Sequence, residues 1–374
     1  MRLNGSCHSL AAVLLGLLGC VSPTTQYANL SPEQIEAEQL RQQALAIRSE
    51  IIEQNRLRSL AWPMLKAATP LCGQWITTRS GIIVANLYAY NKEYRAAAQS
   101  LGMSDTLTVV GVASGSGAAR AGVRTGDRIV AVNERQAPMG GNAIPSFASM
   151  VQPKAVQRGG PALASIPIRF AMWRPEDSHR TSASEVPIEV PQDTVCAYDP
   201  VAVKDQSLNA WADGQRVVVT TAMLRFAGSD DELAPIVAHE IAHNAKRHID
   251  AKKANATVGA IFGAILDVAA ASQGVNTGGD FTQSGAAIGA MSYSQDFERE
   301  ADYVGMYILA RSGRSFASAP DIWRRMAQES PGSIKYASTH PTSAERFIRL
   351  ERAVEEIQRK LQAGNPLLPE AKAP

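Results

Sequence analysis

Apolar residues follow a helical period in the middle of the chain, between residues 229 and 245. They recur close to every 3.6 positions: Leu233, Ile236, Val237, Ile241 and Ala242. Ser229 precedes them, and Glu232 follows it at the spacing of a capping box, which marks the start of a helix. The pattern therefore predicts an amphipathic helix that begins directly after Ser229.

Strand-like patterns dominate residues 77–195 instead. Runs of β-branched residues at Val109–Val112 and Ile129–Val132 are separated by turns of small residues. Further strands are expected at Ile166–Trp173 and Val186–Val190. These short runs predict a β-rich domain inserted between more helical parts of the chain.

A helix is expected before this insertion, with Ser31 as its N-cap and Pro32 at its first position. It should run to about Leu60, with Pro63 limiting the next helix. The predicted fold class is α+β: a mainly helical domain with a short, edge-exposed sheet, and the β-rich insertion. The expected boundaries are 20–76 for the N-terminal linker and helix, 77–195 for the insertion, 196–362 for the main domain and 363–374 for a disordered tail.

Two segments after residue 250 have unusual compositions. Residues 255–272 are markedly apolar, but they contain Asp267 and are only moderately hydrophobic. We therefore expect a buried or interfacial helix there, in preference to a membrane span. Residues 273–290 are rich in Gly, Thr, Ser and Asn, which predicts a flexible lid.

The predicted helix after Ser229 contains the run His239-Glu240-Ile241-Ala242-His243. Two histidines four residues apart share one helix face and can bind one zinc ion. Glu240 would then lie beside the metal, where a carboxylate can take a proton from a zinc-bound water. The alternative is an amphipathic helix that carries two surface histidines.

A catalytic zinc site needs a third ligand. Some families place a histidine six residues after the second one, but that position is Ile249, which excludes them. Glu298 and Asp302 offer another solution, because residues four apart on a second helix share a face. Glu298 would bind zinc and Asp302 would orient a ligand histidine. Glu300 is rotated away by about 200° and is interpreted as a solvent or structural carboxylate.

At this point the chain resembles the zinc metallopeptidases of the BepA, HtpX and Oma type, which are related to the CAAX prenyl proteases. The matching segments occur in the family's order: Asn209–Ala212, Arg216–Thr221, Asp231–His243, His248, Tyr293–Asp302, Thr339–Pro341 and Arg346. Gln295 stands where the family usually has Arg, which removes a charge near the site. The resemblance covers residues 200–350.

The resemblance implies a gluzincin-type domain with one zinc ion, Glu240 as general base, and His340 or Arg346 as a partner of the oxyanion. His340 could instead occupy the fourth zinc position and hold the enzyme latent, or simply cap the last helix. Residues 216–221 would be an edge strand that pairs with an extended substrate. His248 would point to a different face from His243 and be structural. The substrates implied are unfolded or misassembled proteins of the bacterial envelope.

The amino terminus has the pattern of a secretory signal in residues 1–19, with an apolar run from Leu10 to Leu18. Leu17-Leu18-Gly19-Cys20 resembles a bacterial lipobox, so Cys20 would carry lipid and anchor the chain. Val21 follows it, which by that resemblance favours the outer membrane of a Gram-negative bacterium, facing the periplasm. An ordinary cleaved signal is the alternative. In such an oxidising compartment, Cys72 and Cys196 could form a disulfide that clamps the base of the insertion.

The insertion closely resembles a PDZ domain of the bacterial periplasmic proteases, through Val109–Val112, Ala118–Gly122 and Gly126–Asn133. PDZ domains bind peptides by β-augmentation. Gly81, Ile82 and Ile83 are the candidate ligand loop. A purely supporting role for the domain is the alternative.

Charge excludes one class of partner. The net charge of +2 falls to +1 without Arg2, which argues against nucleic acid. Three functions remain: a zinc metalloendopeptidase, a latent or non-proteolytic chaperone that binds client peptides, and a structural zinc protein. A site with three protein ligands and an adjacent glutamate favours catalysis.

Overall fold

The structure is a computed structural model. It describes residues 25, 28–152, 166–174, 185–273, 277–291, 294–329 and 344–371. Residues 1–42 and residues 43–374 form two separate units. Within the described part, the second unit combines helices with three β-sheets, so the predicted mixture of helix and sheet is confirmed.

In the first unit, helix α1 (Pro32–Ala67) begins as the sequence predicts. Ser31 and Gln34 each accept a hydrogen bond from the other's backbone N–H, which caps the helix. The expected end near Leu60 is wrong, because α1 continues through Pro63 to Ala67. In the second unit, the last turns of α1 are held in the core by buried side chains: Leu57, Leu60, Ala61, Trp62, Met64 and Leu65.

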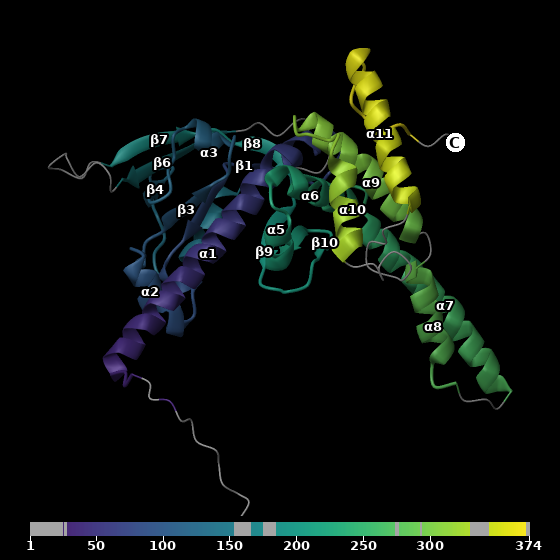
Figure 1. The fold of residues 1–374 in the computed structure, drawn as a ribbon, viewed down its shortest axis with the longest axis horizontal. Helices are drawn as coiled ribbons and strands as arrows, with labels where there is room; N and C mark the ends of the chain where they lie inside the picture. The colour runs from purple at the N-terminus through teal and green to yellow at the C-terminus, as the bar shows by residue number, and fades with distance from the viewer. Residues whose placement is uncertain are drawn as a thin grey trace, which may run out of the picture. The chain divides into compact units, whose positions relative to one another are not determined.

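A helical core surrounds the predicted motif helix, which is α6 (Asp230–Ala245), with Ser229 as its N-cap. α6 packs against α9 (Ser294–Arg311) and α10 (Ala319–Glu329), and α11 (Ala344–Gln362) covers α9 and α10 (Figure 1). One continuous apolar cluster joins these helices to the end of α1. Burial of this surface is the main force that fixes α6 and α9 against each other.

A three-stranded sheet lies beside α6, in the order β10 (Ala210–Ala212), β11 (Arg216–Thr220), β9 (Asp199–Val203). β11 is therefore the central strand, and the expectation that it is an edge strand is wrong. The physical reason is the turn at Asp213-Gly214, where a positive φ of 95° folds β10 back onto β11. β9 is parallel to β11 on the other side. Short helix α5 (Thr221–Phe226) follows β11.

The two edges of this sheet differ. The side-chain amide of Gln54, on α1, donates to the carbonyl of Pro200 and accepts from the N–H of Ala202. These two bonds cover β9 in the way that a neighbouring strand would. Among the described residues, β10 is left as the edge of the sheet next to the motif helix.

A larger sheet is formed by residues that lie between α1 and the three-stranded sheet in the sequence. Its strands are β2 (Ile82–Ala85), β3 (Thr108–Val112), β4 (Arg128–Val132), β5 (Arg135–Gln136), β6 (Ile168–Trp173) and β7 (Val186–Val190). β6 and β7 confirm the two strands expected at their positions. The short helices are α2 (Arg95–Ser100), α3 (Gly117–Arg120) and α4 (Ala143–Val151), with 3₁₀ turns at Thr69–Leu71, Leu87–Ala89 and Lys92–Tyr94.

The six-stranded sheet has a core of its own. Val109, Phe147 and Phe170 are among the residues of this second apolar cluster, which is separate from the helical core. The chain enters and leaves the region through paired strands β1 (Ile76–Arg79) and β8 (Asp193–Cys196). The structure joins Cys72 to Cys196 by a disulfide at this base.

Helices α7 (His248–Ser272) and α8 (Asp280–Met291) connect α6 to α9 in the sequence and form an antiparallel hairpin that projects from the other helices (Figure 1). Arg247, in the left-handed conformation with φ of 59°, ends α6 and redirects the chain into α7. Of the two alternatives expected for this segment, a buried helix is wrong, since only 6% of its apolar window is buried, and an interfacial helix stays a prediction. The expectation of a flexible lid at 273–290 is also wrong for residues 280–290, which are helical because α8 packs along α7.

Candidate metal centre

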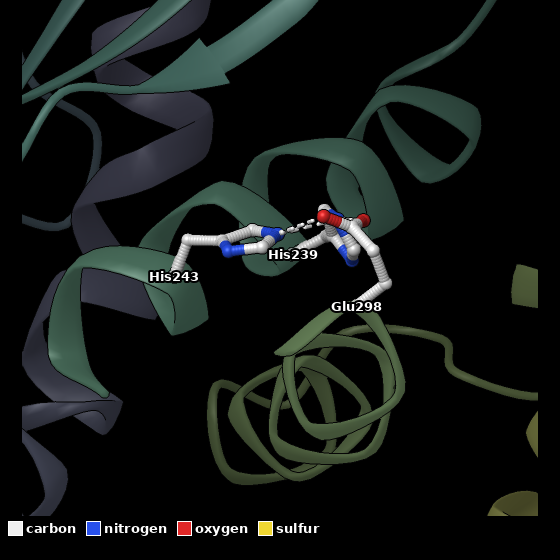
Figure 2. Close-up of side chains that lie close together, drawn as sticks. All are labelled: His239, His243 and Glu298. Atoms are coloured by element: carbon white, nitrogen blue, oxygen red, sulfur yellow. Dashed lines mark hydrogen bonds and ion pairs between the residues drawn. The ribbon is translucent and has the colours of Figure 1, made fainter. Parts of the chain in front are cut away.

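Three buried side chains meet where α6 faces α9. His239 and His243 extend from α6, and Glu298 extends toward them from α9 (Figure 2). Each offers one ligand atom, and these atoms lie within 4.8 Å of one another. The Nε2 atoms of the two histidines are 3.1 Å apart. Of the Glu298 carboxylate, Oε2 lies 3.3 Å from Nε2 of His239 and Oε1 lies 3.4 Å from Nε2 of His243.

These distances fit a shared zinc ion. A tetrahedral zinc with ligand bonds of about 2.0–2.1 Å holds neighbouring ligand atoms about 3.3 Å apart. Two imidazole nitrogens and one carboxylate are also the donor set of catalytic zinc sites, which leave a fourth position open. The residues present therefore fit zinc in both geometry and chemistry.

The close approach of α6 and α9 depends on Gly305. A Cβ atom at this position would lie 3.2 Å from the backbone N of His239 and 3.3 Å from its Cα. A side chain there would press directly on the backbone that carries the first histidine. The sequence contains this glycine, but only the packing of the two helices reveals its role.

A chain of polar contacts supports His239. Its Nδ1 atom lies 2.9 Å from Oδ1 of Asp302, and the same oxygen accepts a hydrogen bond of 2.6 Å from Nη2 of Arg346. If Nδ1–H donates to Asp302, then Nε2 presents its lone pair toward Glu298 and the metal position. The guanidinium of Arg346 also lies 3.7 Å from the centre of the Trp323 ring. Asp302 thus stands where the sequence predicts a residue that orients a ligand histidine.

A second chain of contacts supports His243. Its Nδ1 atom lies 3.0 Å from Nδ1 of His248, and Nε2 of His248 lies 3.1 Å from Oε2 of Glu300. The expectation that His248 points to another face is wrong, because the turn at Arg247 starts a new helix and brings His248 back toward His243. Of the two interpretations of Glu300, the contacts favour a structural carboxylate, since it also pairs with Lys246 at 2.8 Å.

The two histidines differ electrostatically. Burial disfavours the charged form of His239, but hydrogen bonds with Asp302 and Glu298 outweigh it and raise the pKa to about 9. Burial dominates at His243 and lowers its pKa to about 4. The hydrogen bond with His248 lowers the pKa of Glu300 to about 2, which keeps that carboxylate charged. Burial would raise the pKa of Asp302, but Arg346 and His239 lower it.

The remaining predicted residues fall into three groups. Glu240 is buried on α6 between the two histidines, and Arg346 is buried against Asp302. Gly81, Ile82 and Ile83 line a groove of about 540 Å³ beside the six-stranded sheet. His340 and Cys20 lie outside the described residues. Sequence reasoning missed Gly305, and it missed Trp323, whose ring centre lies 5.4 Å from that of His239.

Comparison with known proteins agrees with this geometry. Residues 180–354 match peptidase family M48. The chain is 30% identical over 183 residues to the putative beta-barrel assembly-enhancing protease of Vibrio cholerae, covering 45% of this chain and 36% of that protein. It is 33% identical over 146 residues to the beta-barrel assembly-enhancing protease of Yersinia pestis, covering 37% and 29%.

A mitochondrial relative is equally similar. The chain is 30% identical over 168 residues to the mitochondrial metalloendopeptidase OMA1 of Schizosaccharomyces pombe, covering 44% of this chain and 48% of that protein. The matches therefore span less than half the length of each of these three relatives.

Proposed function

We propose that this chain, a BepA- and Oma-like member of peptidase family M48, is a zinc-dependent metalloendopeptidase. The observation that carries the proposal is the buried group of His239, His243 and Glu298, with ligand atoms at the spacing of a shared zinc ion. Glu240 lies between the two histidines in the sequence of the same helix. This combination supports hydrolysis over a purely structural metal site.

Each residue of the centre would have a distinct task. Zinc, when bound, supplies a Lewis acid and lowers the pKa of water to about 7. His239, His243 and Glu298 would hold it. Glu240 would accept a proton from the attacking water and pass it to the leaving amine. The contact of Arg346 with Asp302 supports a role in fixing that carboxylate, and hence the ring of His239, in preference to the oxyanion contact expected from the sequence.

The substrate would be an extended segment of a protein. β10 is an edge strand next to α6, so the backbone of an extended substrate can pair with it. β10 would thus have the role expected of residues 216–221. The names of the bacterial relatives refer to the assembly of β-barrels. We extend this to unfolded or misassembled envelope proteins as substrates, with the chain facing the periplasm and anchored through lipid at Cys20.

Residues 77–195 would form an inserted PDZ domain that binds peptides. β2 is an edge strand of the six-stranded sheet. Gly81, Ile82 and Ile83 line the groove of about 540 Å³ together with Phe147 and Val151 of α4. A groove between an edge strand and a helix, lined by apolar and polar side chains, suits a peptide that adds a strand and inserts alternate side chains.

The experiment compares the chain from Val21 to Pro374 with its Glu240→Gln variant, both loaded with zinc, on casein as an unfolded substrate. The parent should cleave casein, a chelator should stop it, and Glu240→Gln should reduce cleavage by at least ~10³-fold, because the general base is lost while the ligands remain. Asp231→Asn, an exposed position on the first turn of the same helix, is the matched control and should cleave normally.

Zinc content distinguishes the outcomes. Equal zinc in parent and Glu240→Gln, with cleavage by the parent alone, supports the proposal. Zinc-loaded parent that leaves casein intact contradicts it and favours a latent or non-proteolytic factor that binds clients.

A further inference from the structure

The hairpin of α7 and α8 exposes a run of large apolar side chains. α7 contains an 18-residue window of mean hydropathy 1.6, and only 6% of that window is buried. Its largest apolar side chains are mostly open to solvent, with Phe262 66% and Val268 71% exposed. Large contiguous apolar patches mark sites of interaction with a protein or a membrane.

These side chains form a stripe along one face of α7, which we call the α7 stripe. Its members follow the spacing i, i+3, i+4, i+7, i+8: Val258, Ile261, Phe262, Ile265 and Leu266. On an ideal helix they fall within an arc of about 140°. The α7 stripe is therefore a continuous surface and not a scatter of single exposed residues.

A different face of α7 is already occupied by α8. A Cβ atom on Gly263 would lie 2.0 Å from the carbonyl oxygen of Phe281, so the two helices touch backbone to backbone. Gly285 meets Gly259 in the same way, at 2.2 Å from its carbonyl oxygen. Such close packing at small residues is common between helices in membranes. On an ideal helix the centre of the α7 stripe is rotated by about 130° from Gly263, so most of the stripe lies outside the contact with α8.

The charged residues of the hairpin lie outside the α7 stripe. Between Lys253 and Asp296 the sequence contains two charged residues, Asp267 and Asp280. Asp267 lies on the face toward α8, where it accepts hydrogen bonds from the hydroxyls of Thr277 and Thr282 and from the N–H of Thr282. The α7 stripe itself carries no charge.

We propose that the α7 stripe inserts into the interfacial region of a lipid bilayer, with the hairpin lying along the membrane surface. Lipid fits better than a protein partner, because the stripe consists of Val, Ile, Leu and Phe and lacks the Trp, Tyr and Arg anchors typical of protein interfaces. An orientation along the surface fits better than a crossing. A crossing would carry the charged Asp267, which lies within α7, into the bilayer, where a carboxylate at the centre costs about 2.5–3.5 kcal/mol.

This placement relates the membrane to the metal centre. His248, the first residue of α7, contacts His243, and Nζ of Lys252 lies 3.6 Å from Oε1 of Glu298. Val258, the start of the stripe, is ten residues after His248, or about 15 Å along the helix. Membrane contact through the stripe would keep the centre close to the bilayer surface, where newly exported or misassembled membrane proteins lie. This last step rests on the proposed peptidase function, whereas membrane binding itself does not.

The test is flotation with vesicles of phosphatidylcholine and phosphatidylglycerol. The chain from Val21 to Pro374 keeps every residue that the structure describes and omits Cys20, so no lipid anchor contributes. The parent should float with the vesicles. A Phe262→Glu/Ile265→Glu variant should reduce the bound fraction by at least ~10-fold, because two carboxylates would have to enter the interface. Ile52→Glu, at an equally exposed apolar residue of α1, should float like the parent.

Each other outcome overturns the proposal. These are a parent that stays with the soluble fraction, a double variant that floats as well as the parent, or binding that vanishes in 0.5 M salt and so depends on charge. A parent that stays soluble and dimerises through the stripe, with the double variant monomeric in ultracentrifugation, would identify a second copy as the occupant. We expect the double variant to cleave casein in solution and to bind zinc at parental levels. A loss of both would indicate that the variant does not fold. A parent that floats but does not cleave casein would contradict the peptidase function and leave membrane binding intact.

Discussion

The Nδ1 atom of His243 lies 3.0 Å from Nδ1 of His248, and the far nitrogen of His248 lies 3.1 Å from the carboxylate of Glu300. For Nε2 of His243 to offer its lone pair, Nδ1–H must donate to His248, whose Nε2–H then donates to Glu300. His239 reaches Asp302 in one such step. Each ligand histidine is therefore connected to a carboxylate on α9, the helix that also supplies Glu298.

The contact with Glu300 predicts a loss of zinc affinity on mutation. Glu300→Ala should weaken zinc binding by about 10–100-fold, because His248 loses the acceptor that fixes its tautomer and so orients His243 less well. Glu300→Gln should restore part of the affinity, since its amide oxygen can still accept. The measurement is competition for zinc with a chromophoric chelator.

Asp296→Asn is the control for Glu300→Ala, because Asp296 lies on the same helix and pairs with Arg299 at the surface. An affinity of Glu300→Ala equal to that of this control would contradict a role of the His248–Glu300 pair in positioning His243.

The pair of Asp302 and Arg346 should matter for both stability and metal binding. Both side chains are buried, so Arg346→Ala removes one of the two groups that compensate the buried Asp302 carboxylate and should lower the free energy of unfolding by up to about 3–5 kcal/mol. Urea denaturation of the zinc-free protein measures this directly. Arg346→Lys should lose less stability. Unchanged stability in Arg346→Ala would show that the ion pair is not maintained in solution.

Gly305 should be intolerant of even one added methyl group. In Gly305→Ala the new Cβ would lie 3.2 Å from the backbone N of His239, so α6 and α9 must separate by a few tenths of an ångström. We expect a loss of about 1–3 kcal/mol in stability and weaker zinc binding, as for other overpacked contacts. Thermal denaturation with and without zinc tests both effects. A Gly305→Ala variant with parental values of each would refute the tight contact.

Asp193 should make stability depend on pH at the base of the inserted sheet. Burial would raise the pKa of this carboxyl, but hydrogen bonds from Arg120, Lys66 and Trp62 outweigh it and lower the pKa. Because the folded pKa is depressed, the stabilisation is complete above the unfolded value of about 3.9 and is lost as pH falls through the folded pKa.

The measurement is the urea midpoint between pH 7 and pH 2. The fall of stability below about pH 4 should be shallower in Asp193→Asn than in the parent, and this variant should be less stable at pH 7 by roughly 1.5–3 kcal/mol. Parallel curves for the two proteins would exclude Asp193 as a contributor.

Local patterns in the sequence are sufficient to predict much of the arrangement of the candidate metal centre. The spacing of His239 and His243, together with the capping signal at Ser229, predicts one helix with both rings on one face. The four-residue spacing of Glu298 and Asp302 likewise predicts a second helix with both carboxylates on one face. These predictions succeed because they depend on helical geometry alone, which the sequence specifies within a few residues.

Predictions that depend on tertiary packing are less successful. His248 returns to the centre because Arg247 adopts a left-handed conformation, which an arginine rarely does and which no local pattern marks. β11 is central and not at an edge because Asp213-Gly214 folds the very short β10 onto it. The role of Gly305 depends on the distance between two helices that are far apart in the sequence.

The most direct test of the central claim is a crystal structure of the zinc-loaded chain with diffraction measured on both sides of the zinc absorption edge. We predict one anomalous peak per chain, about 2.0–2.2 Å from Nε2 of His239, Nε2 of His243 and a carboxylate oxygen of Glu298. A peak at any other set of side chains, or its persistence at full height in Glu298→Ala, would contradict the account.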